Sequence, residues 1–559
     1  MKNVLKYLTV ICVVLGFTSC VDDLNVENID PTVTSSINND QLLMKVYATL
    51  GSTGQEGPSG NADFSSADEG ASGFYRILAE CQEFPADMIL WIWSDAGVKD
   101  VTNCAWTADN ELLRDCWSRL YFNITMCNSF LDIDSDPIRC AEVRTLRAIY
   151  YWVLIDMYGN VPHVTSMSSD MPKLIKRPDL YKWIESELLA AEADLPETKL
   201  SYYRLNKAAA QLMLARLYLN SEVYTNGAVK DYDKAAEYAY KVLSNSNYAL
   251  ASNYRYLFMG DNDENSAVND AWKEIILPIQ ADGAHLRSYA GAQFLIAATH
   301  TVGMPEYGST DYWTCIRSRR ELVRLFFPTL RPVKITDKEN ATTDDADIMA
   351  EIQAQPHVGG WETMTQDAKD DRALFCNYNV YSNEINGTKY DNLIFYTNMG
   401  QANARAPFQS GWSLEKFRSD YADPARKPSD LAWTDMDAPF LRLAEAYLTY
   451  AEAVLRGGAQ QGMTADEAVN TLRRRAHAEE KTGWTLDNLL DEWGREFYCE
   501  GRRRSDLVRF GKFGGDNGYY WEMKSGVQAG KHFEKFRDLY PIPATEINNN
   551  RNLVQNEGY

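Results

Sequence analysis

Carboxylates are the side chains of this sequence that are best suited to chemistry. The chain holds 78 Asp and Glu residues, and a glycoside hydrolase needs only a pair of them across a cleft. The sequence contains no G-x-S-x-G, H-E-x-x-H or nucleotide-binding P-loop pattern, and its six His residues are scattered singly. A hydrolase that uses a carboxylate pair is therefore one function left open, whereas nucleotide chemistry is not supported.

Two acidic clusters have the composition of a site for a hard cation. They are Asp261-Asn262-Asp263-Glu264-Asn265 and Asp435-Met436-Asp437, and Ca²⁺ prefers several oxygen ligands of the kind that such loops present together. The first cluster begins like an EF-hand loop, but Ser266 and Trp272 stand where that loop needs a glycine and a bidentate glutamate. From the residues alone, a calcium site and a solvated acidic turn are both compatible with these clusters.

A run of Glu and Arg near the C-terminus indicates structural ion pairs. Between Glu492 and Asp506 the two residue types alternate at spacings of three and four, which on a helix places opposite charges side by side. The chain has 56 basic against 78 acidic side chains and a net charge of -22, so it would repel a phosphate backbone. We therefore expect no nucleic-acid partner. A neutral ligand such as a sugar is compatible with this charge, and 33 Tyr and 14 Trp residues supply many flat rings with a polar group.

The first forty residues have the layout of a lipoprotein leader. Two lysines precede the apolar run Leu8–Phe17, which is too short to span a bilayer as a helix, and small residues follow before Cys20. We expect residues 1–19 to be a signal peptide, Cys20 to carry the lipid, with palmitate as one acyl chain, and residues 20–39 to form a polar tether. An ordinary secreted protein is the alternative, because the residues just before Cys20 depart from the usual lipoprotein pattern.

Eight further cysteines follow Cys20. No C-x-x-C pair occurs, and the spacings match no zinc-binding pattern. Export permits disulfides, but several of these cysteines fall in apolar helical stretches, where a free thiol is a small core side chain. We expect mostly buried free thiols at Cys81, Cys104, Cys116, Cys127, Cys140, Cys315, Cys376 and Cys499.

Helices must position these groups, because helical periodicity is the strongest pattern in the chain. It covers residues 111–132, 141–158, 205–243 and 438–480. The last two stretches each contain a turn, and they resemble tetratricopeptide repeats, helical hairpins in which small Ala residues let paired helices approach closely. Two unrelated antiparallel helix pairs are the alternative.

The middle of the chain has a different character from its two ends. Between residues 253 and 437 it changes to short apolar runs, Gly-rich loops and acidic stretches, and long irregular segments usually carry function. We therefore predict a mostly α fold, a tetratricopeptide-repeat-like helical scaffold over approximately 40–252 and 438–559 with a loop-rich insertion over approximately 253–437. Together they would form one domain, residues 40–559.

Four features resemble the SusD/RagB family of Bacteroidetes outer-membrane lipoproteins over nearly the whole chain. They are the lipoprotein start, FLRLAEAYL at Phe440–Leu448, the stretch Arg495–Phe510 and the ending YPIPATEINNNRNL at Tyr540–Leu553. The resemblance implies a tetratricopeptide-like scaffold, no catalysis, and a surface-exposed protein held at the outer membrane by its lipid alone. It also implies work as the glycan-capturing lid on a SusC-like TonB-dependent transporter, alongside surface glycan-binding lipoproteins and hydrolases.

Five shorter segments are similar to the sugar site of the starch-binding members of that family. They are Asp68–Gly70, Ser72–Arg76, Leu90–Trp93, Tyr289–Gly291 and Trp313–Cys315. What this resemblance implies is an aromatic arc that matches the curve of an α-1,4-glucan helix. Its platforms would be Trp93, Tyr289 and Trp313, and its hydroxyl-binding side chains would be Asp68 and Arg76.

The same resemblance places a structural calcium ion at Asp263, Asp435 and Asp437. It also shows one departure, because Ala96 stands where the starch binders have an asparagine that contacts sugar. The departure leaves the affinity and the preferred linkage open. For Trp91 we expect a place in the core, since Trp91 and Trp93 share one face only in an extended segment.

The sequence leaves three functions as alternatives. The first, which we predict, is non-catalytic binding of starch or malto-oligosaccharides for delivery to a TonB-dependent transporter. The second is a surface glycoside hydrolase with an unrecognised carboxylate pair. The third is a surface binder of another glycan or of a peptide.

Overall fold

The computed structural model describes residues 38–54, 61–66, 69–300, 304, 307–330, 357, 359–385, 388–392, 411–527 and 529–559. The predicted signal peptide, Cys20 and most of the predicted tether lie outside these ranges and stay predictions. Within the ranges, no helix is both long enough and apolar enough to cross a membrane.

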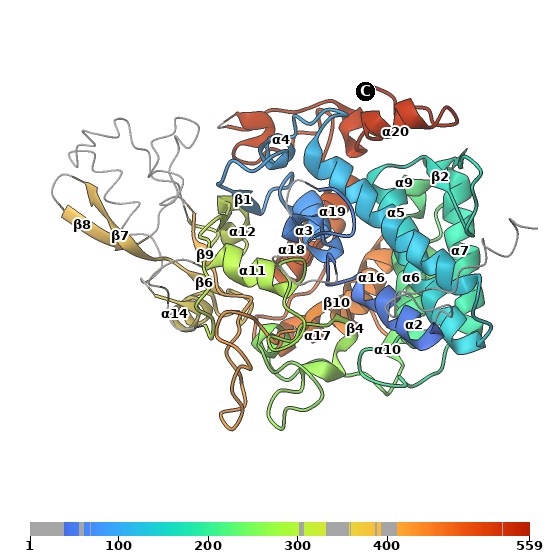
Figure 1. Cartoon of the computed structure of the whole chain (residues 1–559). Helices are drawn as coiled ribbons and strands as arrows, with labels where there is room; N and C mark the ends of the chain where they lie inside the picture. Colours follow the sequence, from blue (N-terminus) through green and yellow to red (C-terminus); the bar gives the residue numbers. More distant parts are fainter. Residues whose placement is uncertain are drawn as a thin grey trace, which may run out of the picture.

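Long helices that pack side by side form one half of the molecule (Figure 1). In chain order, neighbours pack together from α5 to α8, α8 packs on α10, and α16 packs on both α10 and α17. The two predicted hairpins therefore stack on each other, although some 200 residues separate them in the sequence. This confirms the predicted tetratricopeptide-like scaffold. Its helices are α2 (Asn39–Ala48), α5 (Glu111–Leu131), α6 (Pro137–Met157), α7 (Arg177–Asp194), α8 (Lys207–Leu219), α10 (Tyr232–Leu243), α16 (Leu443–Leu455) and α17 (Ala465–Arg475).

Local sequence explains where the scaffold helices begin and how closely they pack. The side chains of Asn110, Asp136 and Thr464 accept hydrogen bonds from the first turns of α5, α6 and α17, as capping residues do. In α8, every residue from Ala208 to Leu219 is buried, which is the pattern of a helix enclosed on all sides. Its small alanines allow α7, α10 and α16 to approach it together.

The other helices pack against the scaffold or belong to the loop-rich side of the molecule. A central group, α3, α18 and α19, packs between the scaffold and the loop-rich side (Figure 1). The bounds are α3 (Phe74–Glu83), α4 (Val98–Thr102), α9 (Ser221–Tyr224), α11 (Ala292–Thr299), α12 (Arg320–Arg324), α14 (Trp361–Ala368), α18 (Leu486–Phe497), α19 (Arg503–Arg509) and α20 (Ala544–Asn549).

Strands in the described residues are short and form antiparallel pairs only. The pairs are β1 (Ile89–Trp91) with β5 (Ile316–Ser318), β2 (Val161–His163) with β3 (Lys173–Ile175), β4 (Ile275–Ile279) with β10 (Ala438–Arg442), β6 (Phe375–Cys376) with β9 (Ser413–Leu414), and β7 (Tyr378–Ile385) with β8 (Thr388–Asn392). Most of them belong to the stretch between residues 253 and 437, and the β7–β8 hairpin projects from the body (Figure 1).

Charged side chains form a buried network where α18 meets the scaffold. Arg442 donates to Glu496 at 2.7 Å and to Glu274 at 3.1 Å, and all three side chains are fully buried. Burial alone would raise the pKa of Glu496, but Arg475, Arg442 and Arg372 hold that pKa well below its ordinary value. The carboxylate is therefore ionised and paired throughout the neutral range.

The predicted ion pairing between Glu492 and Asp506 is confirmed, but most partners lie far away in the sequence. Arg495 does pair with Glu492 at 2.9 Å, whereas Arg503 reaches Asp87 at 2.7 Å and, just beyond the predicted segment, Arg509 reaches Glu452 at 2.7 Å. A helical spacing rule finds only local partners, so it could not show that this segment joins three parts of the chain.

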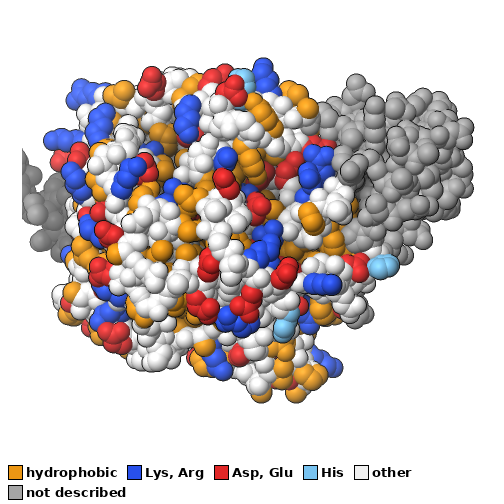
Figure 2. All heavy atoms as spheres, turned by 180° about the vertical axis from the view of Figure 1, so that it is seen from behind, with side chains coloured by type: hydrophobic (Ala, Val, Ile, Leu, Met, Phe, Trp, Pro, Cys, Tyr) orange, Lys and Arg blue, Asp and Glu red, His pale blue; other side chains and the backbone are white. Residues whose placement is uncertain are grey.

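On the face of the molecule seen in Figure 2, basic and acidic side chains are interspersed.

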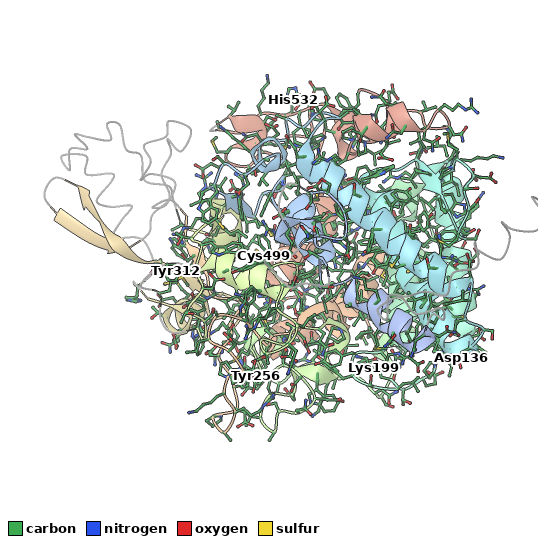
Figure 3. All side chains as sticks on the ribbon, viewed as in Figure 1. Asp136, Lys199, Tyr256, Tyr312, Cys499 and His532 are labelled. Carbon is green, nitrogen blue, oxygen red and sulfur yellow. The ribbon has the colours of Figure 1, made fainter. Side chains whose placement is uncertain are left out.

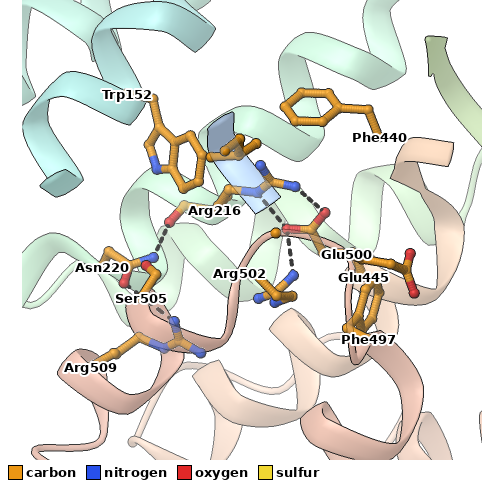
Figure 4. Close-up of a pocket in the computed structure, with 12 residues that line it drawn as sticks. Trp152, Arg216, Asn220, Phe440, Glu445, Phe497, Glu500, Arg502, Ser505 and Arg509 are labelled. Atoms are coloured by element: carbon orange, nitrogen blue, oxygen red, sulfur yellow. Dashed lines mark hydrogen bonds and ion pairs between the residues drawn. The ribbon is translucent and has the colours of Figure 1, made fainter. Parts of the chain in front are cut away.

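Figure 4 shows the part of this network around Glu445, whose carboxylate accepts from Arg216 at 2.6 Å and pairs with Arg502 at 3.3 Å. The cavity between these side chains holds about 20 Å³. That volume has room for about one water molecule. The cavity is therefore too small for a ligand, and we assign its residues to stability.

All eight cysteines expected to be core thiols are free, as predicted. Seven are buried and Cys140 is half-buried. Burial raises the pKa of Cys104 and that of Cys127 to about 12, so these thiols stay protonated and unreactive at neutral pH. Cys499 lies near the centre of the molecule (Figure 3).

Candidate functional site

Trp93, Trp313 and Tyr289 lie in one row of contacting rings. The Trp93 and Trp313 rings are stacked with centroids 6.2 Å apart and planes at 29°, and the Trp313 and Tyr289 centroids are 5.0 Å apart with planes at 46°. Trp93 is 38% exposed, and the other two side chains are half-buried. The structure thus brings together three aromatic residues that are far apart in the sequence, with part of the row open to solvent.

One end of the β1–β5 ladder positions both Trp93 and Trp313. Trp91 pairs with Ile316, and the Ile92 amide donates to the Cys315 carbonyl at 3.0 Å, so Trp93 and Trp313 emerge at the same end of the ladder. Trp91 is 5% exposed and belongs to the core, as expected. The extended backbone up to Trp91 brings Trp91 against Phe294 and leaves Trp93 against Trp313, with the rings of Trp91 and Trp93 also in contact.

A second layer of residues supports the row from inside. Phe294 of α11 is fully buried with its ring 6.2 Å from that of Trp313. The guanidinium of Arg76, on α3, lies 4.5 Å from the Phe294 ring and 5.8 Å from the Trp313 ring. Arg76 also pairs with Glu80 at 2.8 Å and is 7% exposed. These contacts place the Arg76 guanidinium beneath the platform, and direct contact with a ligand remains a prediction.

Two of the segments singled out in the sequence touch each other directly. A Cβ atom at Gly73 would lie 2.0 Å from the Cβ of Ala290, so only glycine allows this approach. The Arg76 amide donates to the Ala290 carbonyl at 3.0 Å and fixes the start of α3 against the chain that carries Tyr289. Asp68, the other predicted hydroxyl-binding residue, lies outside the described residues.

Three residues of this region were missed by the sequence reasoning. Trp433 contacts Tyr289, with centroids 4.7 Å apart. Asp311 lies next to Tyr289, and Asp95, which is exposed, accepts from the Trp91 indole at 2.6 Å. Their isolated positions in loops gave no signal by spacing. The run Asp311-Tyr312-Trp313 was the one local hint, and Tyr312 lies on the side from which β7 and β8 project (Figure 3).

The electrostatics of the row suit a neutral ligand with hydroxyl groups. Burial, and after it the Asp311 carboxylate, raise the pKa of Tyr289 to about 12. The Tyr289 hydroxyl therefore keeps its proton at neutral pH and can donate a hydrogen bond. Exposed ring faces next to hydroxyl and carboxylate groups can bind a molecule with apolar faces and polar edges, which is the character of a sugar.

The three predicted calcium ligands are close enough to influence one another. Burial, with smaller contributions from the carboxylates of Asp263 and Asp435, raises the pKa of Asp437 to about 8. Asp263 makes a bidentate ion pair with Arg426. The Asp435 carboxylate accepts hydrogen bonds from the Gly283 amide and from the Tyr421 and Ser429 hydroxyls. Among the residues that the structure describes, no group of three or more His, Cys, Asp and Glu side chains is arranged closely enough to hold a metal ion.

One atom of this cluster nevertheless fits a cation. Asp437 is fully buried, and its Oδ2 accepts no hydrogen bond at normal distance, although the nearby Tyr203 hydroxyl favours the ionised form. A buried carboxylate oxygen without a partner costs free energy unless a proton or a cation satisfies it. Lys199 interacts electrostatically with Asp437, but burial lowers the pKa of Lys199 to about 7. The donor set is therefore compatible with calcium, and the site stays a prediction.

The stacked helices form a scaffold, and a row of partly exposed aromatic rings lies on its loop-rich side. Together these two features define a class of helical-repeat, ligand-binding proteins. Two family descriptions match the sequence, "SusD family" over residues 298–559 and "Starch-binding associating with outer membrane" over residues 34–219. The starch-binding protein SusD of Bacteroides thetaiotaomicron is 41% identical over 97% of this chain and 96% of that protein. The chain therefore belongs to the SusD family.

Solved structures agree on the fold. A surface glycan-binding protein A from Bacteroides fluxus aligns with a TM-score of 0.64 at 19% identity, over 93% of this chain and 99% of that one. A laminarin-binding SusD-like protein aligns with a TM-score of 0.59 at 20% identity, again over 93% and 99%. At these identities the likeness extends to the fold alone.

Proposed function

We propose that the protein is a non-catalytic, cell-surface binder of starch and malto-oligosaccharides. The observation that carries the proposal is the contacting row of Trp93, Trp313 and Tyr289, the three residues that the family resemblance predicts as platforms. Support comes from the 41% identity to a starch-binding protein over nearly the full length of both chains.

The row would hold a glucan by two kinds of contact. Apolar faces of successive sugar rings would pack on the aromatic faces, where each buried Å² of apolar surface contributes about 25 cal/mol. The planes of neighbouring rings in the row differ by 29° and 46°, so a curved chain fits better than a flat one. Sugar hydroxyls would bond to the Tyr289 hydroxyl and to the carboxylates of Asp311 and Asp95. Asp68 and Arg76 remain candidates for the same task.

We base the proposals on delivery and anchoring on membership of the family. We infer association with the outer membrane, in line with the description of the family matched by residues 34–219. The finer proposals are that a lipid on Cys20 holds the protein there and that bound glycan passes to a SusC-like TonB-dependent transporter. Neighbouring hydrolases would supply shorter chains, and neighbouring glycan-binding lipoproteins would bind glycan at the same surface.

We also propose that Asp263, Asp435 and Asp437 hold a structural calcium ion. When bound, the ion would compensate three carboxylates that otherwise repel each other, and it would satisfy the Oδ2 atom of Asp437. The ion would take no part in glycan binding.

Ala96 is exposed beside Asp95. Replacing Ala96 with asparagine therefore asks directly whether this position limits the affinity for glycan.

Incubation with labelled maltoheptaose separates the alternatives. Binding without any shorter product is the expected result. Release of shorter products would make the protein a hydrolase. Neither binding nor product would favour another glycan or a peptide as the ligand, and a panel of other glycans would then identify it.

A further inference from the structure

The aromatic row continues beyond Tyr289. The Trp433 ring contacts Tyr289 with centroids 4.7 Å apart and planes at 51°, which is as close as the contact between Tyr289 and Trp313. Trp433 is half-buried, so part of the side chain is open to solvent. Each ring from Trp93 to Trp433 therefore contacts the next, and Trp433 lies at the Tyr289 end of the row.

Two loops that leave the β4–β10 ladder deliver Tyr289 and Trp433 to this contact. Aspartates of the loop after residue 428 tie it to the loop after residue 279. The ties are Asp437 Oδ1 accepting from the Ala281 amide at 2.9 Å, Asp435 Oδ1 accepting from the Gly283 amide at 2.9 Å, and Asp430 pairing with Arg287 at 2.8 Å. The two loops are thus held together along their length.

The residues on both sides of Trp433 are fixed to the helix that supports the platform. Gln293 of α11 is 2% exposed. Its Nε2 donates to the Ala432 carbonyl at 2.8 Å, and its Oε1 accepts from the Thr434 amide at 2.8 Å. Gly283 adds a close approach, because a Cβ there would lie 2.5 Å from the Trp433 carbonyl oxygen. Since Phe294 of the same helix packs on Trp313, Trp433 is held in register with the rest of the row.

We propose that Trp433 is a fourth platform of the glycan site and sets the length of α-1,4-glucan chain that the site recognises best. This rests on the proposed function, because it assumes that glucan lies along the row. A short chain can cover two or three rings without reaching Trp433. A longer chain that covers Trp93, Trp313 and Tyr289 also brings a sugar to Trp433 and gains its ring face as contact surface.

The test measures affinity against chain length by isothermal titration calorimetry with maltotriose, maltopentaose and maltoheptaose. Wild type should bind the longer chains more tightly. Trp433→Ala should match wild type within about twofold for maltotriose and weaken maltoheptaose by about tenfold, the loss expected for one uncovered ring. Trp433→Tyr keeps a flat ring and should recover most of the difference.

Controls separate a platform from a support. Tyr238, a half-buried tyrosine on α10 of the scaffold, provides the matched control, and Tyr238→Ala should bind all three sugars as wild type does. A Trp433→Ala protein that weakens all three sugars equally, or none, would overturn the proposal. If that variant did not fold, Trp433→Gln would be used for the same comparison. Wild type that binds none of the sugars would instead show that the proposed function itself has failed.

Discussion

Replacing Trp93 by alanine should weaken glucan binding while the fold survives. Trp93 is 38% exposed, and a tryptophan side chain has up to about 250 Å² to bury, so roughly 90 Å² of it is open to a ligand. At about 25 cal/mol per Å², complete coverage is worth about 2 kcal/mol. The dissociation constant for maltoheptaose should therefore rise by roughly tenfold to thirtyfold, depending on how much of the ring the sugar covers.

The same variant should lose less stability than a core substitution does. Among the aromatic pairs of the described residues, Trp93 makes an edge-to-face contact with Trp91 and stacks on Trp313. Such pairs are worth about 1 kcal/mol each, so we expect a loss of about 2 kcal/mol. Trp91→Ala is the contrasting variant, because Trp91 is 5% exposed and a buried Trp to Ala change costs about 3 to 5 kcal/mol. Calorimetric titration and thermal melting of both variants separate a loss of binding from a loss of folding.

A Trp93→Ala protein that melts normally and binds maltoheptaose like wild type would remove Trp93 from the site. If Tyr289→Ala and Trp313→Ala behaved in the same way, the starch proposal would fall. Loss of binding in the scaffold variant Tyr238→Ala would show that a loss of binding is not specific to substitutions in the row.

Three further predictions concern anchoring, the cation site and the buried network. Labelled palmitate should enter the full-length protein in its host and be lost in Cys20→Ala, and unchanged labelling would refute the anchor. Calcium should raise the melting temperature and EDTA should lower it, which an indifferent melting curve would contradict. Because the folded pKa of Asp437 is raised to about 8, calcium-free protein should lose stability as pH rises from about 4 through 8. Asp437→Asn should reduce that loss and abolish the calcium effect, while Glu83 and Glu415, with pKa values raised to about 7, retain part of the slope. Glu496→Gln should cost about 3 to 5 kcal/mol, because it leaves Arg442 and Arg475 with an uncompensated buried charge, and chemical denaturation would reveal a smaller effect if the network were dispensable.

Local sequence determined much of the architecture by itself. Helical periodicity located α5, α6, α8, α10, α16 and α17, because a helix repeats its buried face every three to four residues and needs no distant partner to show it. The family resemblance selected Trp93, Tyr289 and Trp313. The alternation of Glu and Arg after Glu492 indicated ion pairs, since opposite charges at helical spacing are a local pattern.

Only the tertiary structure decided how these parts meet. The stacking of α10 on α16 joins segments about 200 residues apart, and no periodicity encodes which helix packs on which. Trp433 joined the row because the aspartates of its loop bind the loop that carries Tyr289. The partners of Arg503 and Arg509 were likewise set by packing. Contacts between loops depend on the path of the whole chain, so a single aromatic residue or arginine gives no sign of them until that path is known.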